Sequence, residues 1–450
     1  MTTLESSRRQ FLTASLTGVA AFAAGTRTAR SAETPTNRPT VTAPRATSFD
    51  NAVEPNWDER LTITVGPNDA DIIGSSHKAL QAAVDYVANL GGGTVQMQPG
   101  KYVLRGAVHL RSGVRMRGAG DDTVITKIPS RSSKLLVDSD WYDQEITLAP
   151  GHGFEIGDSV CLRAKNAHYG NPEVLKRRLV ARSGDRFKLD LPLKENYWQM
   201  GEPTANALFP LLTGEEIERI AIEHLTLDGD RANNANLDGN YAGCIFLQDC
   251  RSIQIRDVTA RNYNGDGISW QICHDVTVED CRSHDHAGLG LHPGSGSQRP
   301  VMRRNKLSGN DIGLFFCWGV KYGLAEDNVC DGNRVGLSIG HRDTDNLIRG
   351  NRIENSRDVG LLFRPERGPT FCAHRNVIEH NTLLNNGGPN AAAVDVQGGT
   401  EDVAIRHNEL RDSRGPAERT GIRLGAETQR ITLAENRIEG FATAIRDMKG

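Results

Sequence analysis

Ionisable and aromatic side chains that could perform chemistry gather between residues 264 and 367. Four of the 13 histidines lie from His274 to His292, and tryptophan, arginine, aspartate and glutamate follow at short intervals. Exposed histidines and a tryptophan have no packing reason to collect in one stretch, so the cluster predicts a functional site. Our candidates are, for catalysis, His292, His341, Arg364 and Asp266; for substrate binding, Trp318, His286, Arg342, Arg367 and Gln271; and for a metal, Asp343 and Asp345.

Two mechanisms suit these residue types. Elimination beside the carboxylate of a uronate needs a base within hydrogen-bond reach of the proton, and a cation or an Arg/His side chain to neutralise the carboxylate. His292, His341 and Arg364 can divide these roles, and Asp343 with Asp345 can hold a calcium ion. Hydrolysis instead needs two or three carboxylates around one glycosidic bond.

A short repeated phrase, glycine followed by alternating apolar residues, must position these side chains. Its first six copies are spaced 24, 21, 25, 23 and 24 residues apart and begin at Gly243, Gly267, Gly288, Gly313, Gly336 and Gly360. Each copy predicts a strand too short to bury its apolar face alone, so successive copies should stack as parallel coils. The second and fourth residues of a copy should face inward and the third and fifth outward, which places Gln271, His292 and Arg364 in one outward row.

Asparagines keep the same interval as the glycines. They stand at Asn305, Asn328, Asn351, Asn381, Asn408 and Asn436, each two residues before an apolar residue. An asparagine at one turn position of every coil can form hydrogen bonds along the stack. The pattern therefore predicts an asparagine ladder.

These repeats resemble those of the right-handed parallel β-helix proteins of the pectate-lyase-like superfamily, and the similarity covers about residues 60–450. The start of this region fits as well, because Ser75-Ser76 and apolar residues from Ala79 to Leu90 predict an amphipathic helix closed by Gly91-Gly92-Gly93. In that superfamily such a helix caps the open end of the solenoid. The resemblance implies an all-β fold, a right-handed parallel β-helix (β-solenoid) with an N-terminal capping helix.

Residues 135–213 break the repeat and alternate like antiparallel strands, so we expect a small β insertion within the 60–450 domain. No C-terminal cap follows the last repeat, and this open end is a candidate surface for a homo-oligomer.

Two motifs resemble those of β-helix polygalacturonases. Asn264-Gly265-Asp266-Gly267 is similar to their Asn-x-Asp-Gly motif, and the stretch from Gly288 to Gly294 is similar to their Gly-His-Gly stretch. However, Leu289 stands where that family has its histidine, and the paired aspartates expected between the motifs are missing. These departures count against hydrolysis.

The N-terminus predicts export. Arg8-Arg9 followed by an apolar run to Ala24 is typical of a twin-arginine signal peptide, which we assign to residues 1–32, with a linker over 33–59. The apolar run is too short for a stable membrane span, so the mature protein should be periplasmic or secreted in a bacterium. The net charge of −3 argues against nucleic acid as a partner.

Eight cysteines in such a compartment could pair. Cys250 and Cys273 occupy similar phases of adjacent repeats and are the best candidates for a bridge, but we expect most of the eight to be small buried apolar residues.

Function remains open between three classes, because this fold hosts many activities. We rank first an exported carbohydrate-active enzyme that cleaves a uronate-containing polysaccharide by β-elimination, with calcium as a candidate cofactor. A glycoside hydrolase comes second, and a non-catalytic protein that binds glycans or acts at a surface comes third.

Overall fold

A computed structural model of the protein describes residues 56–449 except 167, 367 and 416. These residues belong to one compact unit, Pro55–Gly450. The predicted signal peptide (1–32), most of the predicted linker (33–59) and Arg367 lie outside the described residues.

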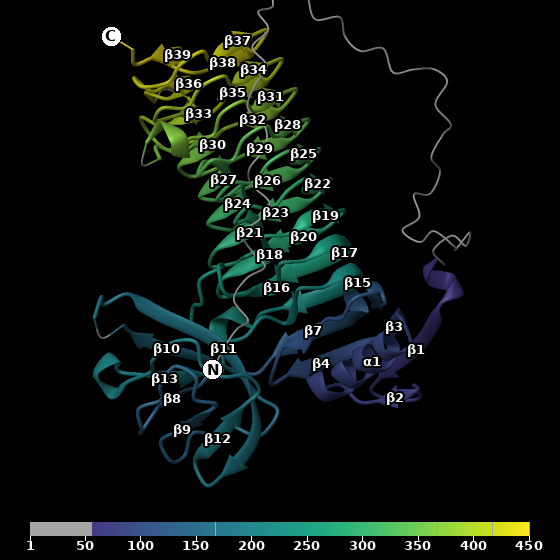
Figure 1. Cartoon of the computed structure of the whole chain (residues 1–450). Helices are drawn as coiled ribbons and strands as arrows, with labels where there is room; N and C mark the ends of the chain where they lie inside the picture. Colours follow the sequence, from purple (N-terminus) through teal and green to yellow (C-terminus); the bar gives the residue numbers. More distant parts are fainter. Residues whose placement is uncertain (1–55, 167, 367, 416, 450) are drawn as a thin grey trace, which may run out of the picture. The chain divides into compact units, whose positions relative to one another are not determined.

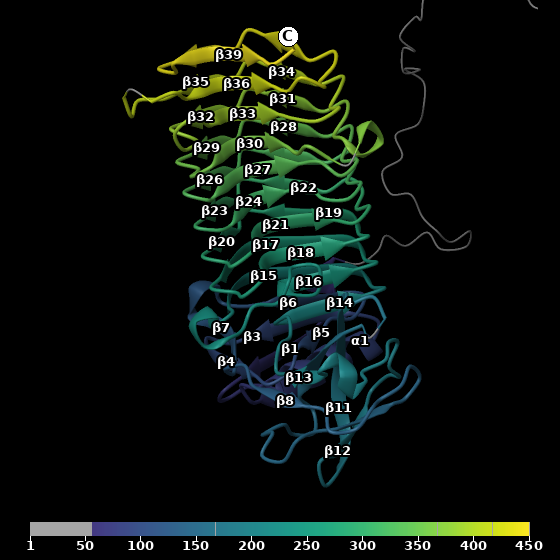
Figure 2. The same cartoon turned by 90° about the vertical axis from the view of Figure 1, so that its left-hand side faces the viewer.

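Stacked coils make up most of the described chain (Figure 1). One wall of the stack is an eleven-stranded parallel sheet in which each strand pairs with the corresponding strand of the next coil. Figure 2 shows these strands stacked one above another. Their bounds are β5 Val108–His109, β14 Leu212–Glu215, β16 Gly243–Gln248, β18 Asp266–Gln271, β21 Leu289–Gly294, β24 Ile312–Phe315, β27 Val335–Ile339, β30 Val359–Phe363, β33 Ala392–Val396, β36 Thr420–Leu424 and β39 Thr443–Asp447.

The remaining strands of the coils form a second parallel sheet of 22 strands. The first coils contribute β1 Leu61–Gly66, β2 Ile72–Ile73, β3 Gly93–Met97, β4 Gly100–Leu104, β6 Val114–Arg117, β7 Thr123–Lys127, β15 Glu218–Asp228 and β17 Arg251–Arg261. The later coils contribute β19 His274–Glu279, β20 Arg282–His284, β22 Val301–Arg303, β23 Lys306–Ser308, β25 Leu324–Glu326, β26 Val329–Asp331, β28 Leu347–Arg349, β29 Arg352–Glu354, β31 Val377–Glu379, β32 Thr382–Leu384, β34 Ala404–Arg406, β35 Glu409–Arg411, β37 Thr432–Ala434 and β38 Arg437–Glu439. The predicted all-β parallel stack is confirmed.

Helix α1, His77–Asn89, packs against the first strands of the stack. Its apolar residues recur every three or four positions, and Leu80, Ala83, Val84 and Val87 are buried as one stripe. The helix thus covers the apolar interior at the start of the coils. Among the described residues no helix has the length and apolar character to cross a membrane.

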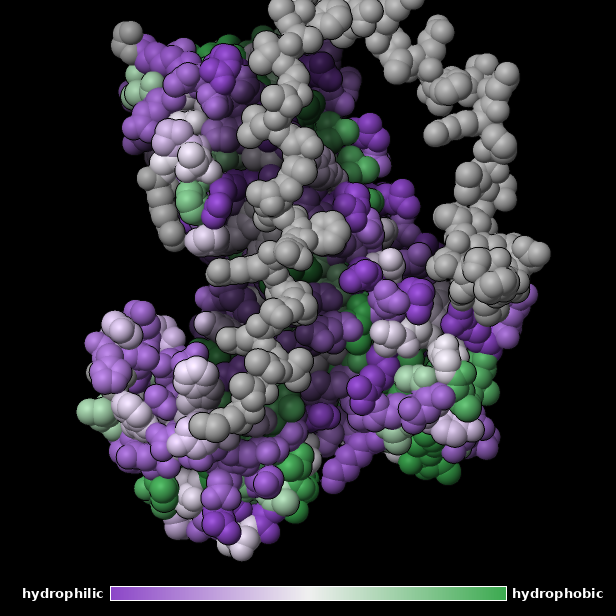
Figure 3. Space-filling view, viewed as in Figure 1, coloured by the Kyte–Doolittle hydropathy of each residue, from purple (hydrophilic) through white to green (hydrophobic). Residues whose placement is uncertain are grey.

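An antiparallel module interrupts the coils between β7 and β14. Its six strands pair in the order β8-β13-β10-β11-β12-β9 and have their own apolar core, which includes Phe154, Phe187 and Tyr197. The bounds are β8 Ser132–Lys134, β9 Glu145–Thr147, β10 Ser159–Lys165, β11 Pro172–Ser183, β12 Arg186–Leu189 and β13 Thr204–Asn206. Figure 3 shows the surface hollowed between this module, at the lower left, and the coils above it.

The pairing of strands in the eleven-stranded sheet shows that the third copy of the repeated phrase does not begin at Gly288, as predicted. Ile268 pairs with Leu291 and Leu291 with Leu314, so the glycine equivalent to Gly267 is Gly290 rather than Gly288. A side chain at Gly290 would place its Cβ 2.5 Å from the carbonyl oxygen of Gly313 in the next coil, which explains why this position requires glycine.

The shifted register also moves a candidate catalytic residue. His292 pairs with Ser269, whereas Gln271 pairs with Gly294. The predicted single row of Gln271, His292 and Arg364 is therefore wrong, and His292 lies in the outward row of Ser269.

The asparagine ladder is confirmed. Each side-chain amide donates to the Oδ1 of the next asparagine at 2.9–3.0 Å, from Asn305 through Asn328, Asn351, Asn381 and Asn408 to Asn436. The ladder supplies hydrogen bonds to buried backbone groups at a corner of every coil.

All eight cysteines are buried and free, and no disulfide joins Cys250 to Cys273.

Candidate functional site

A buried carboxylate–imidazole pair lies on the outward face of the eleven-stranded sheet. Asp266 begins β18 and His292 stands in β21, one coil further along the stack. Asp266 Oδ2 lies 2.7 Å from His292 Nδ1, and Asp266 Oδ1 accepts the backbone N–H of Leu289 at 2.9 Å. Because the carboxylate accepts a hydrogen bond from Nδ1, the neutral imidazole carries its lone pair on Nε2.

His292 Nε2 is buried and has no hydrogen-bond partner in the described part of the chain. The imidazole is stacked on Phe315 of β24, with ring centroids 5.8 Å apart, and the residue is 3% exposed. A buried polar atom without a partner is uncommon and requires an explanation. A role of Nε2 as a proton acceptor would explain why this buried atom has no partner.

A pocket of about 470 Å³ adjoins this pair. Its wall includes Asp266, Leu289, His292 and Phe315 from the sheet, Cys317 just after β24, and residues 236–240, 264–265 and 287–288 from neighbouring turns. We call it the His292 pocket. Two glycines allow these turns to approach the carboxylate: a Cβ at Gly288 would lie 2.4 Å from Asp266 Oδ1, and one at Gly239 would overlap the carboxylate.

An aromatic and charged group borders the pocket at Phe315. We name this group, which consists of Phe315, Trp318, His341, Arg364 and Glu366, the Trp318 cluster. The imidazole of His341 is stacked on Trp318 at 5.0 Å, and its Nε2 lies 3.1 Å from Glu366 Oε2. The guanidinium of Arg364 lies over the Phe315 ring at 5.1 Å, with its Nε 3.6 Å from Glu366 Oε1. The structure thus gathers His292, Asp266, His341, Arg364 and Trp318, which the sequence analysis had selected.

Two candidate binding residues have structural roles. His286 is buried, its Nδ1 accepts the backbone N–H of Tyr263 at 3.1 Å, and its Nε2 lies 3.1 Å from Ser283 Oγ. Burial lowers the pKa of His286 to about 3, so the ring is a neutral part of the interior, and its assignment to substrate binding stays a prediction without support from its contacts. Gln271 is also buried and donates from Nε2 to Ser269 Oγ at 3.2 Å. It therefore supports the wall below His292 and does not line the pocket.

The two proposed calcium ligands have partners within the fold. Asp343 is fully buried and accepts the backbone N–H groups of Gly319, Val320 and Gly340 at 2.7–3.1 Å. Burial raises the pKa of Asp343 to about 8, and the three hydrogen bonds act in the opposite direction. Asp345 is paired with Arg375 through two hydrogen bonds of 2.7 and 2.9 Å. The assignment of Asp343 and Asp345 as calcium ligands stays a prediction. In the described ranges no group of three His, Cys, Asp or Glu side chains could hold a metal ion.

Arg342 lies beside the Trp318 cluster. Its guanidinium is 4.1 Å from the ring centroid of Phe371, in the short 3-10 helix Pro369–Phe371, and the residue is exposed. It remains a candidate for substrate binding. Arg367 lies outside the described residues.

Comparison with known proteins agrees with this architecture. The family model described as "right handed beta helix region" matches residues 224–438. The described chain has the right-handed parallel β-helix fold. No curated protein matches its sequence.

Solved structures share the β-helix at low sequence identity. The A-module of the mannuronan C-5 epimerase AlgE4 from Azotobacter vinelandii is 17% identical, with 86% of this chain and 100% of the module covered and a TM-score of 0.53. The surface adhesin PfbA of Streptococcus pneumoniae is 14% identical, with 82% of this chain and 89% of the adhesin chain covered and a TM-score of 0.52. An exopolygalacturonase from Thermotoga maritima is 13% identical, with 80% of this chain and 87% of the exopolygalacturonase chain covered and a TM-score of 0.49. At these identities the likeness concerns the fold.

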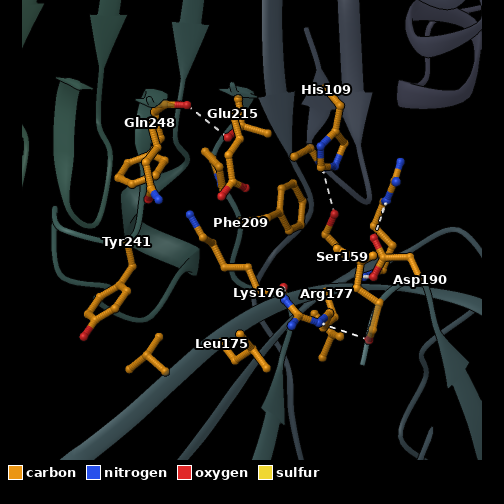
Figure 4. Close-up of a pocket in the computed structure, with 18 of the residues that line it drawn as sticks. His109, Ser159, Leu175, Lys176, Arg177, Asp190, Phe209, Glu215, Tyr241 and Gln248 are labelled. Carbon is orange, nitrogen blue, oxygen red and sulfur yellow. Dashed lines mark hydrogen bonds and ion pairs between the residues drawn. The ribbon is translucent and has the colours of Figure 1, made fainter. Parts of the chain in front are cut away.

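The β-helix also has a larger cavity that the sequence analysis missed. It measures about 570 Å³ and lies between β10 and β11 of the antiparallel module and β14 and β16 of the stack (Figure 4). Its lining includes Lys176, Glu215, Tyr241, Phe246 and Gln248. These residues come from two parts of the chain with different folds, and no motif links them in the sequence. We call it the Lys176 cavity.

Proposed function

We propose that this β-helix protein acts on an acidic polysaccharide and removes the proton beside the carboxylate of a uronate unit, which leads to β-elimination. The observation that carries the proposal is the pair of Asp266 and His292 at the pocket wall. The buried carboxylate orients the ring, and Nε2 has no partner in the described chain. The epimerase module with the same fold is named for its action on mannuronan, a further reason to look to acidic polysaccharides.

In this reaction His292 Nε2 takes the proton from the carbon next to the carboxylate. The C–O bond to the leaving sugar breaks, a C=C bond forms, and the leaving oxygen is protonated from solvent. An imidazole whose Nδ1–H is bound to a carboxylate has its lone pair on Nε2 and can accept the proton there as a general base. Asp266 stabilises the imidazolium that forms.

Phe315 packs against the base. Its ring stacks on the face of the imidazole, and Nε2 is buried, so side chains around this nitrogen have to move before a substrate carbon reaches hydrogen-bond distance. Access only with substrate bound would exclude water from the nitrogen until then.

Arg364 is the best placed group to neutralise the substrate carboxylate. Its guanidinium lies over Phe315, on the border of the His292 pocket, and its contact with Glu366 at 3.6 Å is longer than a hydrogen bond. A planar guanidinium binds a carboxylate through two hydrogen bonds, and charge held there stabilises the enolate-like transition state. Trp318 is 39% exposed and stacks on His341, and we propose that its exposed part contacts a sugar ring.

Hydrolysis is the less suitable mechanism for this pocket. Both oxygens of Asp266 accept hydrogen bonds, from His292 and from Leu289, so this carboxylate is committed to orienting the imidazole. A hydrolase needs two carboxyl groups on either side of the glycosidic bond.

The test is incubation of the purified protein with pectin, alginate and glycosaminoglycans, followed by ultraviolet absorbance of the unsaturated uronate product. His292→Ala and Arg364→Ala should each lower turnover and leave the fold intact. His224→Ala is a matched control, because His224 Nδ1 also lies 2.7 Å from a carboxylate, that of Asp257, on an exposed part of the second sheet. New reducing ends without the absorbance would replace elimination by hydrolysis, and full activity of His292→Ala would remove it from the reaction.

A further inference from the structure

The Lys176 cavity contains a cation that the fold does not neutralise. Lys176 stands in β11 of the antiparallel module and extends toward the coils, where its Nζ lies 3.8 Å from the ring centroid of Phe246 (Figure 4). Among the described residues it makes no salt bridge, although Glu215 lies in the same cavity. Cation–π contact compensates only part of the lost hydration of an ammonium group.

The protonation of Lys176 reflects this environment. Burial lowers its pKa to about 8, and the carboxylate of Glu215 acts in the opposite direction. A bound carboxylate at Nζ would supply the missing counter-charge and return the pKa toward its ordinary value. The cavity is therefore better suited to an anionic ligand than to a cation.

The remaining wall suits a sugar. Tyr241 offers an aromatic surface, and Gln248 and Asn240 offer amide groups that can donate and accept hydrogen bonds. Apolar faces with a few polar groups are typical of sites that bind pyranose rings and similar small polar ligands.

Position connects this cavity to the His292 pocket. Phe246 of β16 pairs with Ser269 of β18, and Ser269 pairs with His292 of β21, so the three residues stand in one outward row. Two strand spacings separate Phe246 from His292, which is about 10 Å. The turn at residues 236–240 lies between the two cavities, since Gly239 accepts a hydrogen bond from Ser269 and Asn240 lines both.

We infer that the Lys176 cavity is a second sugar subsite, in which Lys176 binds the carboxylate of a uronate unit at some distance along the chain from the unit that reacts at His292. The antiparallel module is then a substrate-recognition element, and the preferred ligand is an oligomer with carboxylates on more than one unit. This inference rests on the proposed function for its choice of ligand.

Binding and turnover test it separately. The probes are oligogalacturonates and oligomannuronates from the disaccharide upward, with their methyl-esterified forms, and binding is measured by calorimetry in the full-length protein and in His292→Ala. A charge-assisted hydrogen bond contributes about 1.5–3 kcal/mol, so Lys176→Met should weaken binding of the longer oligomers about ten- to a hundredfold. The shortest oligomers, which fill only the His292 pocket, should bind Lys176→Met and the unaltered protein equally.

Controls separate charge from structure. Lys188→Met removes an exposed lysine from β12 of the same module and should leave binding unchanged. Lys176→Arg should recover part of the lost affinity. Above about pH 8 the affinity of the unaltered protein for long oligomers should fall, and Lys176→Met should not show this fall.

Equal binding of long oligomers by Lys176→Met and the unaltered protein would overturn the subsite, as would equal binding of acid and esterified oligomers or no binding of any oligouronate. If long acidic oligomers bind through Lys176 but are never cleaved, the subsite stands and the proposed elimination fails. If they are cleaved but with the same chain-length preference after Lys176→Met, the elimination stands and the subsite fails.

Discussion

Replacing Asp266 with asparagine should abolish most of the catalytic activity while leaving the protein folded. The two carboxylate oxygens accept hydrogen bonds at 2.7 Å from His292 Nδ1 and at 2.9 Å from the backbone N–H of Leu289. An asparagine has one acceptor oxygen and one NH₂ group, so it can serve only one of these donors. If the oxygen turns to Leu289, the NH₂ group of the asparagine faces Nδ1 of His292. This favours the tautomer with the proton on Nε2, and Nε2 then has no lone pair with which to accept a proton.

The magnitude follows from the groups involved. Loss of a positioned general base lowers the rate about 10²–10⁴-fold. If the oxygen turns to His292 instead, the N–H of Leu289 loses its acceptor, at a cost of about 1–3 kcal/mol for an unsatisfied buried donor. Activity should therefore fall by at least two orders of magnitude at neutral pH, and the free energy of unfolding by no more than about 3 kcal/mol.

The assay is the rate of unsaturated product formation as a function of pH, with urea unfolding measured in parallel. Asp257→Asn is the matched control, because Asp257 Oδ2 lies 2.7 Å from His224 Nδ1 but on an exposed part of the second sheet. Unchanged turnover and an unchanged pH profile in Asp266→Asn would refute the role of the pair. An equal loss of activity in Asp257→Asn would show that the effect is not specific to the pocket.

Three other substitutions probe the fold around the site. Gly239→Ala should lower turnover and lower the free energy of unfolding by about 1–3 kcal/mol, since its Cβ would overlap the Asp266 carboxylate and turn it from His292 and Leu289; kinetics and urea unfolding measured together would show this. Asn351→Ala removes the acceptor of the Asn328 backbone N–H and side-chain amide and the donor to Asn381, and should lower the free energy of unfolding by about 3 kcal/mol or more in urea titrations, because several buried groups lose partners. Burial lowers the pKa of Lys127 to about 7, so between about pH 7 and 10 the unfolded state binds one more proton and stability should rise by up to about 1.4 kcal/mol per pH unit; Lys127→Met should lack this part of the rise in urea titrations at pH 7 and 9.

The sequence predicted those features that depend on contacts between equivalent positions of neighbouring coils. The asparagine ladder and the parallel strands are examples, because each repeat must match the next one in hydrogen bonds and in side-chain size. The same periodicity brought His341, Arg364 and Trp318 to one face.

Register was harder to predict, because the sequence Gly288-Leu289-Gly290-Leu291 fits the repeated phrase from either glycine. The strand register decides between them, because Leu291 pairs with Ile268 and with Leu314. A shift of two residues keeps the pattern of inward and outward positions but changes the neighbours of His292. That is why Asp266 and Phe315, rather than Gln271, contact it.

Burial of polar side chains was a second difficulty. His286 and Asp343 have the residue types of a catalytic site, yet both bind backbone groups at corners of the coils. Backbone N–H groups that are exposed by a tight turn need an acceptor, and a sequence does not show whether a nearby histidine or aspartate serves the turn or a ligand. Lys176 was missed for the opposite reason. It lines a cavity, but the other residues of that cavity come from strands of the stack that are distant in sequence from β11.

Energetics gives an independent reason to assign a function to Asp266 and His292. The buried asparagines of the ladder stabilise the fold, since each one satisfies backbone groups of its neighbours. A buried carboxylate–imidazole pair loses hydration for both partners and is often no more stable than apolar residues of the same size. Asp266 satisfies one backbone group, the N–H of Leu289, and His292 leaves its Nε2 without a partner in the described chain. An arrangement that costs stability and leaves one imidazole nitrogen without a partner, in a residue that lines a pocket, is best explained by what that nitrogen does when a substrate arrives.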